Sequence, residues 1–252
     1  KEKFAEVLKS AKKPMIIIGT SAINNSQGQE VLKICAKISN KLNISNDEFN
    51  GFNVLQQNIS RVGALDLEFY NNSFDNDWNT SIKNHITKTK PVVFLLNLDD
   101  FDSSILDGAF VVYIGSHGDQ GAKNSDLILP GSAFTEQDGY YTNLEGKIQK
   151  AFKASYPTEL AKEDCIIINE IANVVRGKSL FKDKDELVDS MFNYLNQTRN
   201  EEFIQTNYIF ENEKISVDNI DYYFSNAIAK NSKTMSECRS LLNNLKQTGT
   251  DG

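Results

Sequence analysis

The chain contains 252 residues, 40% of them hydrophobic and 24% charged, which is the composition of an ordinary globular protein. Its formal net charge of −7 argues against binding to a nucleic-acid backbone, because that contact needs clustered lysine and arginine. No segment approaches the roughly 18 consecutive apolar residues that a membrane helix requires. We therefore expect any association with a membrane to run through partner proteins.

Three cysteines, Cys35, Cys165 and Cys238, lie far apart in the chain, and no Cys-x-x-Cys pair is present. We therefore expect this chain alone to hold neither an iron–sulphur cluster nor a zinc ion. The odd number of cysteines and their apolar neighbours are typical of buried thiols in a reducing compartment.

The N-terminal stretch predicts a helix, a strand and a second helix. Apolar residues recur at helical spacing over residues 2–11. "MIIIG" (15–19) is a continuous apolar run closed by glycine, which is typical of a strand buried on both faces of a parallel sheet. A polar loop then leads to an amphipathic helix over 29–42. We expect residues 43–90 to be polar and irregular, apart from a compact apolar island at 60–69.

Three further apolar runs predict buried strands, at 91–98 ("PVVFLLNL"), 110–115 ("FVVYIG") and 127–130 ("LILP"). Spacers of helix length separate the strands, which indicates an α/β fold with an open, mostly parallel, doubly wound sheet over residues 1–155. Beyond this point the strand patterns fade. We expect a mainly helical C-terminal region, 156–252, packed on the sheet domain, with helices over 160–175, 185–198 and 221–246.

The loop 19–28 lies between a predicted strand and a predicted helix, where nucleotide phosphates often bind. Its glycines lack the G-x-G-x-x-G spacing of a dinucleotide site, and an ordinary connecting loop explains it as well. A free NAD-binding module is therefore a third hypothesis, which a titration with NADH would test.

The loop after the run 110–115 carries polar side chains that could do chemistry. Ser116, His117 and Asp119 could form a hydrolytic triad at the edge where α/β folds bind ligands. However, neighbours in one loop rarely converge on one geometry, and no G-x-S-x-G motif is present. The alternative is a structural loop in which His117 and Asp119 bond to backbone groups.

Glu136 and Glu145 form a second candidate pair. They could act as acid–base carboxylates that approach each other across a glycine-containing turn. The alternative is that each carboxylate caps backbone N–H groups of a long loop, whose polar backbone must find partners. From the residues alone we assign no catalytic, cofactor-binding or metal-binding side chain.

The segment 117–149 resembles the stretch shared by the molybdopterin oxidoreductase superfamily. The shared pattern is Ser-Asp, an apolar run and Pro, followed by Glu-x-x-Gly and Asn-x-Glu-Gly, and it occupies residues 125–130, 136–139 and 143–147 here. Within that superfamily the chain is similar to the C-terminal portion of the large iron–sulphur subunit of NADH:ubiquinone oxidoreductase, respiratory complex I. This second similarity is carried by residues 12–19, 52–69 and 225–238.

The resemblance implies a structural, cofactor-free part of the peripheral arm of complex I. Such a part would support the cluster-bearing portion of the large subunit while electrons pass from NADH to quinone. The whole complex is a proton-translocating NADH:ubiquinone reductase of the respiratory chain, whereas this chain is expected to have no catalytic site of its own.

The resemblance also implies partners and a location. The expected partners are other peripheral-arm subunits, especially the cluster-bearing N-terminal portion of the large subunit, with no nucleic acid and no direct membrane span. The implied location is the matrix side of the mitochondrial inner membrane or, alternatively, the cytoplasmic face of a bacterial membrane.

A rival hypothesis is a fragment of a catalytic molybdopterin oxidoreductase that binds the nucleotide part of the cofactor on loops 19–28 and 97–121. Two departures from the superfamily pattern bear on it. Lys147 stands where arginine is usual, which removes a bidentate donor. Asn97, with the two residues that follow it, alters a loop that lies near the pterin in catalytic relatives.

Overall fold

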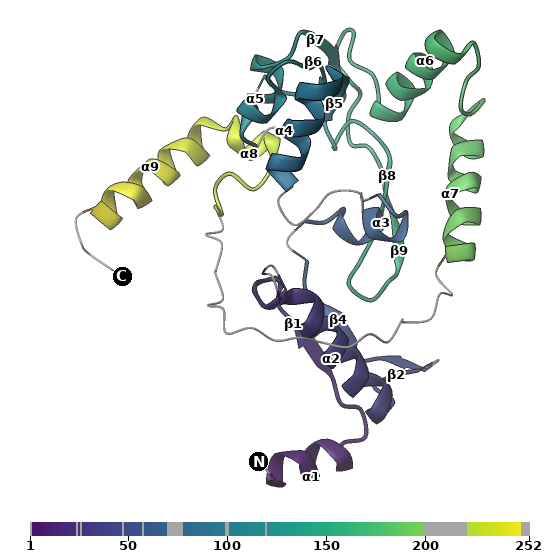
Figure 1. The fold of residues 1–252 in the computed structure, drawn as a ribbon, viewed down its shortest axis with the longest axis vertical. Coiled ribbons are helices and arrows are strands. Elements are labelled where there is room, and N and C mark those ends of the chain that lie inside the picture. Colours follow the sequence, from purple (N-terminus) through teal and green to yellow (C-terminus); the bar gives the residue numbers. More distant parts are fainter. Residues whose placement is uncertain are drawn as a thin grey trace. The chain divides into compact units, whose positions relative to one another are not determined.

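The computed structural model divides into two compact units whose segments alternate along the chain (Figure 1). Unit 1 comprises residues 1–70, 140–151 and 188–219, and unit 2 comprises residues 71–139, 152–187 and 220–252. The predicted boundary between 155 and 156 stays a prediction. The residues that the structure describes are 2–23, 25, 27–46, 48–56, 58–69, 78–98, 101–118, 120–198 and 221–247.

Unit 1 contains a two-stranded parallel sheet of β1 (Ile16–Ile18) and β4 (Phe52–Val54). The helices α1 (Glu2–Ser10) and α2 (Gly28–Leu42) confirm the two predicted N-terminal helices to within a residue at each end. Asn43 ends α2 in the left-handed conformation, with φ of 49°, which asparagine tolerates better than most residues. The other elements of this stretch are η1 (Thr20–Ala22), β2 (Ser45–Asn46), β3 (Phe49–Asn50) and α3 (Arg61–Asp66).

Another pair of strands, β8 (Gly139–Thr142) and β9 (Ile148–Ala151), is joined by a tight turn. The Asn143 side chain accepts hydrogen bonds from the N–H groups of Glu145 (3.0 Å) and Lys147 (2.9 Å). Gly146 has φ of +79°, a conformation that favours glycine. The Asn-x-Glu-Gly motif is therefore the turn of a hairpin.

Unit 2 is built around a three-stranded parallel sheet in the order β5-β6-β7. Its strands are β5 (Val92–Leu96), β6 (Phe110–Gly115) and β7 (Leu127–Pro130), each within one of the runs that predicted a strand. The mixed α/β fold with parallel sheets is thus confirmed. Pro130, which cannot donate a backbone hydrogen bond, stands at the last position of the edge strand β7, where it is tolerated.

One face of this sheet carries the core of unit 2. The buried residues Ile86, Leu95 and Tyr113 pack together there with Leu106 and Val111. They come from the sheet, from α4 (Trp78–Thr89) and from the short helix η2 (Ser103–Leu106). The small helix α5 (Gln120–Lys123) adds Ala122 to the edge of the same cluster.

Burial on both faces was predicted for every strand, and it is found only for β6. In β5 the alternate residues Val92, Phe94 and Leu96 are 57%, 50% and 44% exposed, so the prediction was wrong for that strand. In β1 Ile17 is 60% exposed. The physical reason in unit 2 is that α4, η2 and α5 cover the face that carries Leu95 and Tyr113.

The expectation that residues 43–90 are irregular outside the island at 60–69 was also wrong, because β2, β3, β4 and α4 lie there. The two apolar anchors of α4, Ile82 and Ile86, stand among asparagine, threonine, lysine and histidine. This periodicity is too sparse to indicate a helix by itself. Packing of Ile86 into the core of unit 2 supplies the stabilisation that the local pattern lacks.

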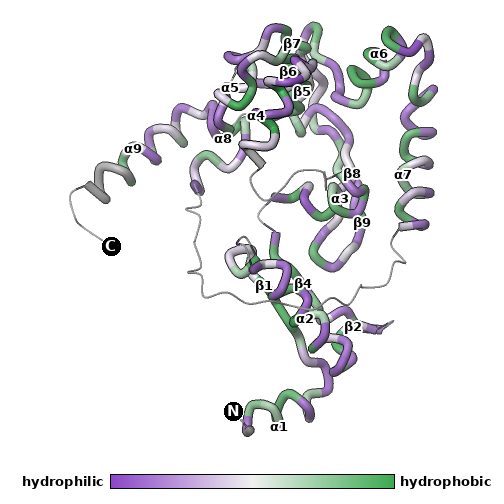
Figure 2. Tube along the Cα trace, in the orientation of Figure 1, coloured by the Kyte–Doolittle hydropathy of each residue, from purple (hydrophilic) through white to green (hydrophobic). Residues whose placement is uncertain are grey.

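The predicted helical C-terminal region is confirmed by four helices among the described residues. Figure 2 shows apolar and polar stretches alternating along α6 and α7. None of the described helices is both long and apolar enough to cross a membrane. The four are α6 (Asp164–Arg176), α7 (Lys184–Thr198), α8 (Ala227–Lys230) and α9 (Lys233–Gln247).

Two of these helices begin later than expected. The helix predicted from residue 160 starts at Asp164, because Lys162 is in a parallel β-bridge with Gly131. The helix predicted from residue 221 is split, and Asn226 caps α8 by accepting a hydrogen bond from the Ala229 N–H at 2.9 Å.

Candidate functional site

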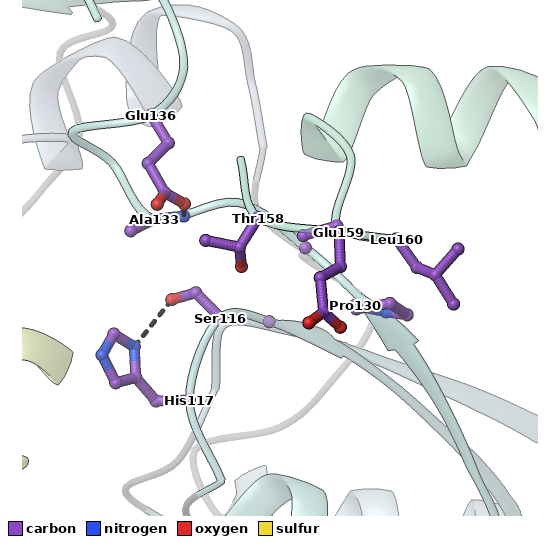
Figure 3. A pocket seen from close by; sticks show the side chains of 11 residues that line it. Ser116, His117, Pro130, Ala133, Glu136, Thr158, Glu159 and Leu160 are labelled. Atoms are coloured by element: carbon purple, nitrogen blue, oxygen red, sulfur yellow. Dashed lines mark hydrogen bonds between the residues drawn. The ribbon is translucent and has the colours of Figure 1, made fainter. Parts of the chain in front are cut away.

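A pocket of about 400 Å³ lies at the carboxyl end of β6 and β7 in unit 2. This is the edge of a parallel sheet at which α/β proteins bind their ligands. Figure 3 shows side chains from three segments around it: the turn after β6, the loop after β7 and the segment before α6. The lining residues are Gly115, Ser116, His117, Pro130, Gly131, Ala133, Glu136, Thr158, Glu159, Leu160 and Ala161.

The turn after β6 is held by Tyr113, which is 1% exposed. Its hydroxyl donates to the backbone oxygen of His117 at 3.2 Å. A Cβ atom on Gly121 would lie 2.6 Å from the Tyr113 ring and 2.5 Å from the Leu98 oxygen. Glycine at 121 therefore lets α5 approach the tyrosine closely, and the tyrosine in turn supports the pocket wall.

Ser116 and His117 meet, as the triad hypothesis requires of two of its members. The Ser116 hydroxyl lies 2.8 Å from His117 Nδ1 (Figure 3), whereas Asp119 lies outside the described residues. The alternative, in which the His117 side chain bonds to the backbone, stays a prediction; its Nδ1 pairs with this hydroxyl. A hydrogen bond between adjacent side chains stabilises the turn and does not by itself make a nucleophile.

Glu136 has the structural role that was expected of it. Its Oε2 accepts a hydrogen bond from the Ala133 N–H at 2.9 Å, and this closes the turn after β7. The expectation that the Glu145 carboxylate, in unit 1, caps backbone N–H groups of its turn was wrong. Asn143 accepts the hydrogen bonds in that turn, including the one from the N–H of Glu145 itself.

Sequence reasoning missed Glu159, which brings a second carboxylate to the pocket. In Figure 3 this carboxylate points towards the side of the pocket formed by Ser116 and Pro130. Glu159 has φ of 47°, a left-handed conformation that is uncommon for a residue with a side chain of this size. Such strained backbone conformations occur at functional sites. No pattern in the sequence indicates that Glu159 adopts one.

A polar junction lies behind the pocket wall at Gly131. Asp164, the first residue of α6, accepts hydrogen bonds at Oδ2 from Asn97 Nδ2 (2.9 Å) and Gln137 Nε2 (3.3 Å). Its other oxygen, Oδ1, is buried and has no partner. Burial raises the pKa of this carboxyl above its usual value, although both amides act to lower it. This junction was not predicted.

The remaining candidates are the three cysteines and the loop 19–28. Burial raises the pKa of the Cys35 and Cys165 thiols, and both cysteines are free, as is Cys238. The described residues contain no group of three histidine, cysteine or acidic side chains that could hold a metal ion. In the loop 19–28, a Cβ on Gly28 would meet the Ile23 oxygen at 1.8 Å, so this glycine serves close backbone packing.

The sequence of this chain is similar to known proteins over most of its length. Residues 1–174 match the family of molybdopterin oxidoreductases. The chain belongs to this family. It is also 36% identical over 244 residues to a NADH-quinone oxidoreductase subunit from Rickettsia bellii, an alignment that covers 94% of this chain and 34% of that protein.

Two further proteins are similar over the same range. The 75 kDa subunit of NADH-ubiquinone oxidoreductase from Reclinomonas americana is 32% identical over 254 residues, covering 94% of this chain and 36% of that protein. The mitochondrial 78 kDa subunit from Neurospora crassa is 31% identical over 255 residues, covering 93% and 33%. The chain thus spans about a third of the length of these relatives.

The family implies a molybdopterin nucleotide, and the pocket does not fit one. A pyrophosphate needs lysine, arginine or a cradle of backbone N–H groups. The eleven described residues that line the pocket include no lysine and no arginine, but they include Glu136 and Glu159. Two carboxylates facing a dianionic group at short range would repel it.

Proposed function

We propose that the chain is a cofactor-free structural part of a proton-translocating NADH–quinone oxidoreductase, complex I. The observation that carries this proposal is the similarity to subunits of NADH-quinone and NADH-ubiquinone oxidoreductases over 93–94% of the chain, at 31–36% identity. In this role it belongs to the peripheral arm and supports the cluster-bearing part of the large subunit. Electrons pass through that other part and not through this chain.

The acidic pocket supports the cofactor-free part of the proposal. The family fold offers a binding edge at the carboxyl ends of β6 and β7, yet the side chains there suit neither pyrophosphate nor a soft metal. Glu136 is already engaged with the backbone of Ala133. In this proposal the pocket is retained from the family fold, and residues of the family motif such as Glu136 have structural roles.

Exposed apolar side chains support extensive contact with partner chains. Leu160, Val174 and Val175 are 81%, 83% and 76% exposed. Apolar side chains this exposed are available for contact with a partner chain. We infer that the principal partner is the cluster-bearing portion that makes up the rest of the relatives' length.

Purification of the native assembly tests this function. A tagged copy of the chain, extracted with a mild detergent, should carry other complex I subunits with it, as mass spectrometry would identify. The fraction should oxidise NADH with quinone as acceptor. A tagged chain that purifies alone, from cells whose complex I is intact, would contradict the proposal.

The proposed location is the matrix side of the mitochondrial inner membrane, with the cytoplasmic face of a bacterial membrane as the alternative. The relatives include both a mitochondrial protein and a bacterial one. Protease protection of sealed mitochondria and of inverted membrane vesicles distinguishes the two sides. The proposed domains, 1–155 and 156–252, are tested by limited proteolysis, which should cut first near residue 155.

The catalytic alternative rests on the family match of residues 1–174. A catalytic fragment would bind the nucleotide part of a molybdopterin on loops 19–28 and 97–121. Stoichiometric molybdenum or tungsten in the native assembly would support it, and the carboxylates of the pocket argue against it.

A further inference from the structure

We propose that Asp164 is a proton-linked latch, which ties the end of β5, the loop after β7 and the start of α6 together and binds a proton as unit 2 folds. The proposal concerns the fold of unit 2 and holds whether or not the chain belongs to complex I.

The geometry of the latch rests on three segments that are far apart in the sequence. Asn97 follows β5 and donates to Asp164 Oδ2 at 2.9 Å. Gln137 donates to the same oxygen at 3.3 Å, and its Oε1 accepts the Asp164 N–H at 3.4 Å. One carboxyl group therefore joins a strand end, a loop and a helix start.

The second oxygen of Asp164 explains the link to a proton. Oδ1 is buried without a hydrogen-bond partner, and it lies against Gly131, where a Cβ atom would be only 2.6 Å away. A negative charge on this oxygen is costly because the atom is buried and no described protein group donates a hydrogen bond to it. When a proton from solvent binds to Oδ1, the charge is removed while Oδ2 still accepts both amide hydrogen bonds.

The surrounding charges act in the same direction. Glu163, the preceding residue, raises the Asp164 pKa by its negative charge, and it pairs with Lys153 (3.7 Å) and with Lys184. On the loop after β7, the Glu136 carboxylate is bonded to the Ala133 N–H. No lysine or arginine is an identified cause of the shift in the Asp164 pKa, and its largest cause is burial.

The sign of the pH dependence follows from these facts. Because the pKa of Asp164 is raised in the folded chain, the folded state binds more protons than the unfolded state between the two pKa values. The contribution of this group to stability therefore falls as pH rises through that window, and it is restored as pH falls. Asp164 therefore stabilises the folded chain more when it is protonated than when it is ionised, because burial outweighs the amide hydrogen bonds that favour the charge.

A carboxyl-detected NMR titration of the 252-residue chain tests the latch, with Asp164→Asn used to assign the signal. The midpoint should lie above the ordinary aspartate value, and it should rise further in Asn97→Ala, because that amide favours the ionised form. Asn173→Ala, which removes an exposed amide from the same helix, should leave it unchanged. A midpoint at or below the ordinary value, or no response to Asn97→Ala, overturns the proposal.

Thermal unfolding gives a second readout. Asp164→Asn mimics the protonated group, so its melting temperature relative to the natural chain should be higher at neutral pH than at about pH 4, near the ordinary aspartate value. Asp185→Asn, an exposed carboxylate on α7, should show no such change. If the melting temperatures of Asp164→Asn and the natural chain differ by the same amount at neutral pH and at about pH 4, the latch is contradicted. If that variant does not fold, the response of the natural chain to Asn97→Ala still decides the question.

Discussion

The side chain of Asn97 donates a hydrogen bond to Asp164 at 2.9 Å across 67 residues of sequence. The contact fastens the end of the edge strand β5 to the first turn of α6. It also places one of the departures from the family pattern, at Asn97, in a structural role.

The first prediction compares a buried glutamate before α6, which pairs with two lysines, with an exposed glutamate on α6. Glu163 has a side chain only 12% exposed and contacts both Lys153 and Lys184. Glu163→Gln should lower the free energy of unfolding by about 1–3 kcal/mol, because it leaves two lysines without their buried partner. Urea denaturation of the purified chain measures the loss.

The control for this comparison is Glu170, whose pair with Lys162 is 55% and 50% exposed. Glu170→Gln should cost less than about 1 kcal/mol, because solvent screens an exposed pair. Equal losses for Glu163→Gln and Glu170→Gln would show that burial of the Glu163 carboxylate has no structural consequence.

The second prediction concerns the close approach of α5 to the core. Gly121→Ala places a methyl group within 2.6 Å of Tyr113 and 2.5 Å of the Leu98 oxygen. We expect a loss of about 1–3 kcal/mol, despite the better helix propensity of alanine, because a packed core resists added volume. Gly118→Ala meets nothing within 4 Å and should change the melting temperature little. A neutral Gly121→Ala would mean that α5 is not packed on Tyr113.

The third prediction tests how Tyr113 supports the pocket. Tyr113→Phe keeps the buried ring but removes the hydrogen bond to the backbone oxygen of His117. The loss should be about 1 kcal/mol, and amide exchange in the turn 115–118 should become faster. Unchanged exchange in that turn would show that another contact holds the pocket wall.

The fourth prediction addresses the start of α2 in unit 1. Gly28→Ala brings a methyl group to 1.8 Å from the Ile23 oxygen, a clash that only a backbone shift can relieve. The variant should lose about 3 kcal/mol or more, at the upper end of overpacking costs. Gly19→Ala is the matched control in the same loop, since its nearest new neighbour is 3.9 Å away. Melting temperatures that drop equally in both variants would contradict the close packing at Gly28.

Strongly patterned elements of the fold were predictable from sequence. The strand β6 begins and ends where "FVVYIG" indicates, because a continuous apolar run is compatible with burial on both faces. The helix α2 likewise follows from its amphipathic stripe. By contrast, α4 carries few apolar residues and β4 is only three residues long, and tertiary packing rather than local pattern fixes them.

The candidate site was predictable only in part. The location at the carboxyl end of β6, and with it Ser116 and His117, followed from the rule for parallel sheets. Glu159 and Asp164 did not follow. Glu159 reaches the pocket through a left-handed backbone conformation. Asp164 lies behind the pocket wall, where contacts to Asn97 and Gln137 that no sequence spacing encodes hold it.

The central claim is that this member of the molybdopterin oxidoreductase family works without the family cofactor. Elemental analysis of the native assembly, purified through a tag on this chain, tests it most directly. We expect iron from the cluster-bearing partner and no stoichiometric molybdenum or tungsten. Molybdenum or tungsten present in a one-to-one ratio with the chain would contradict it.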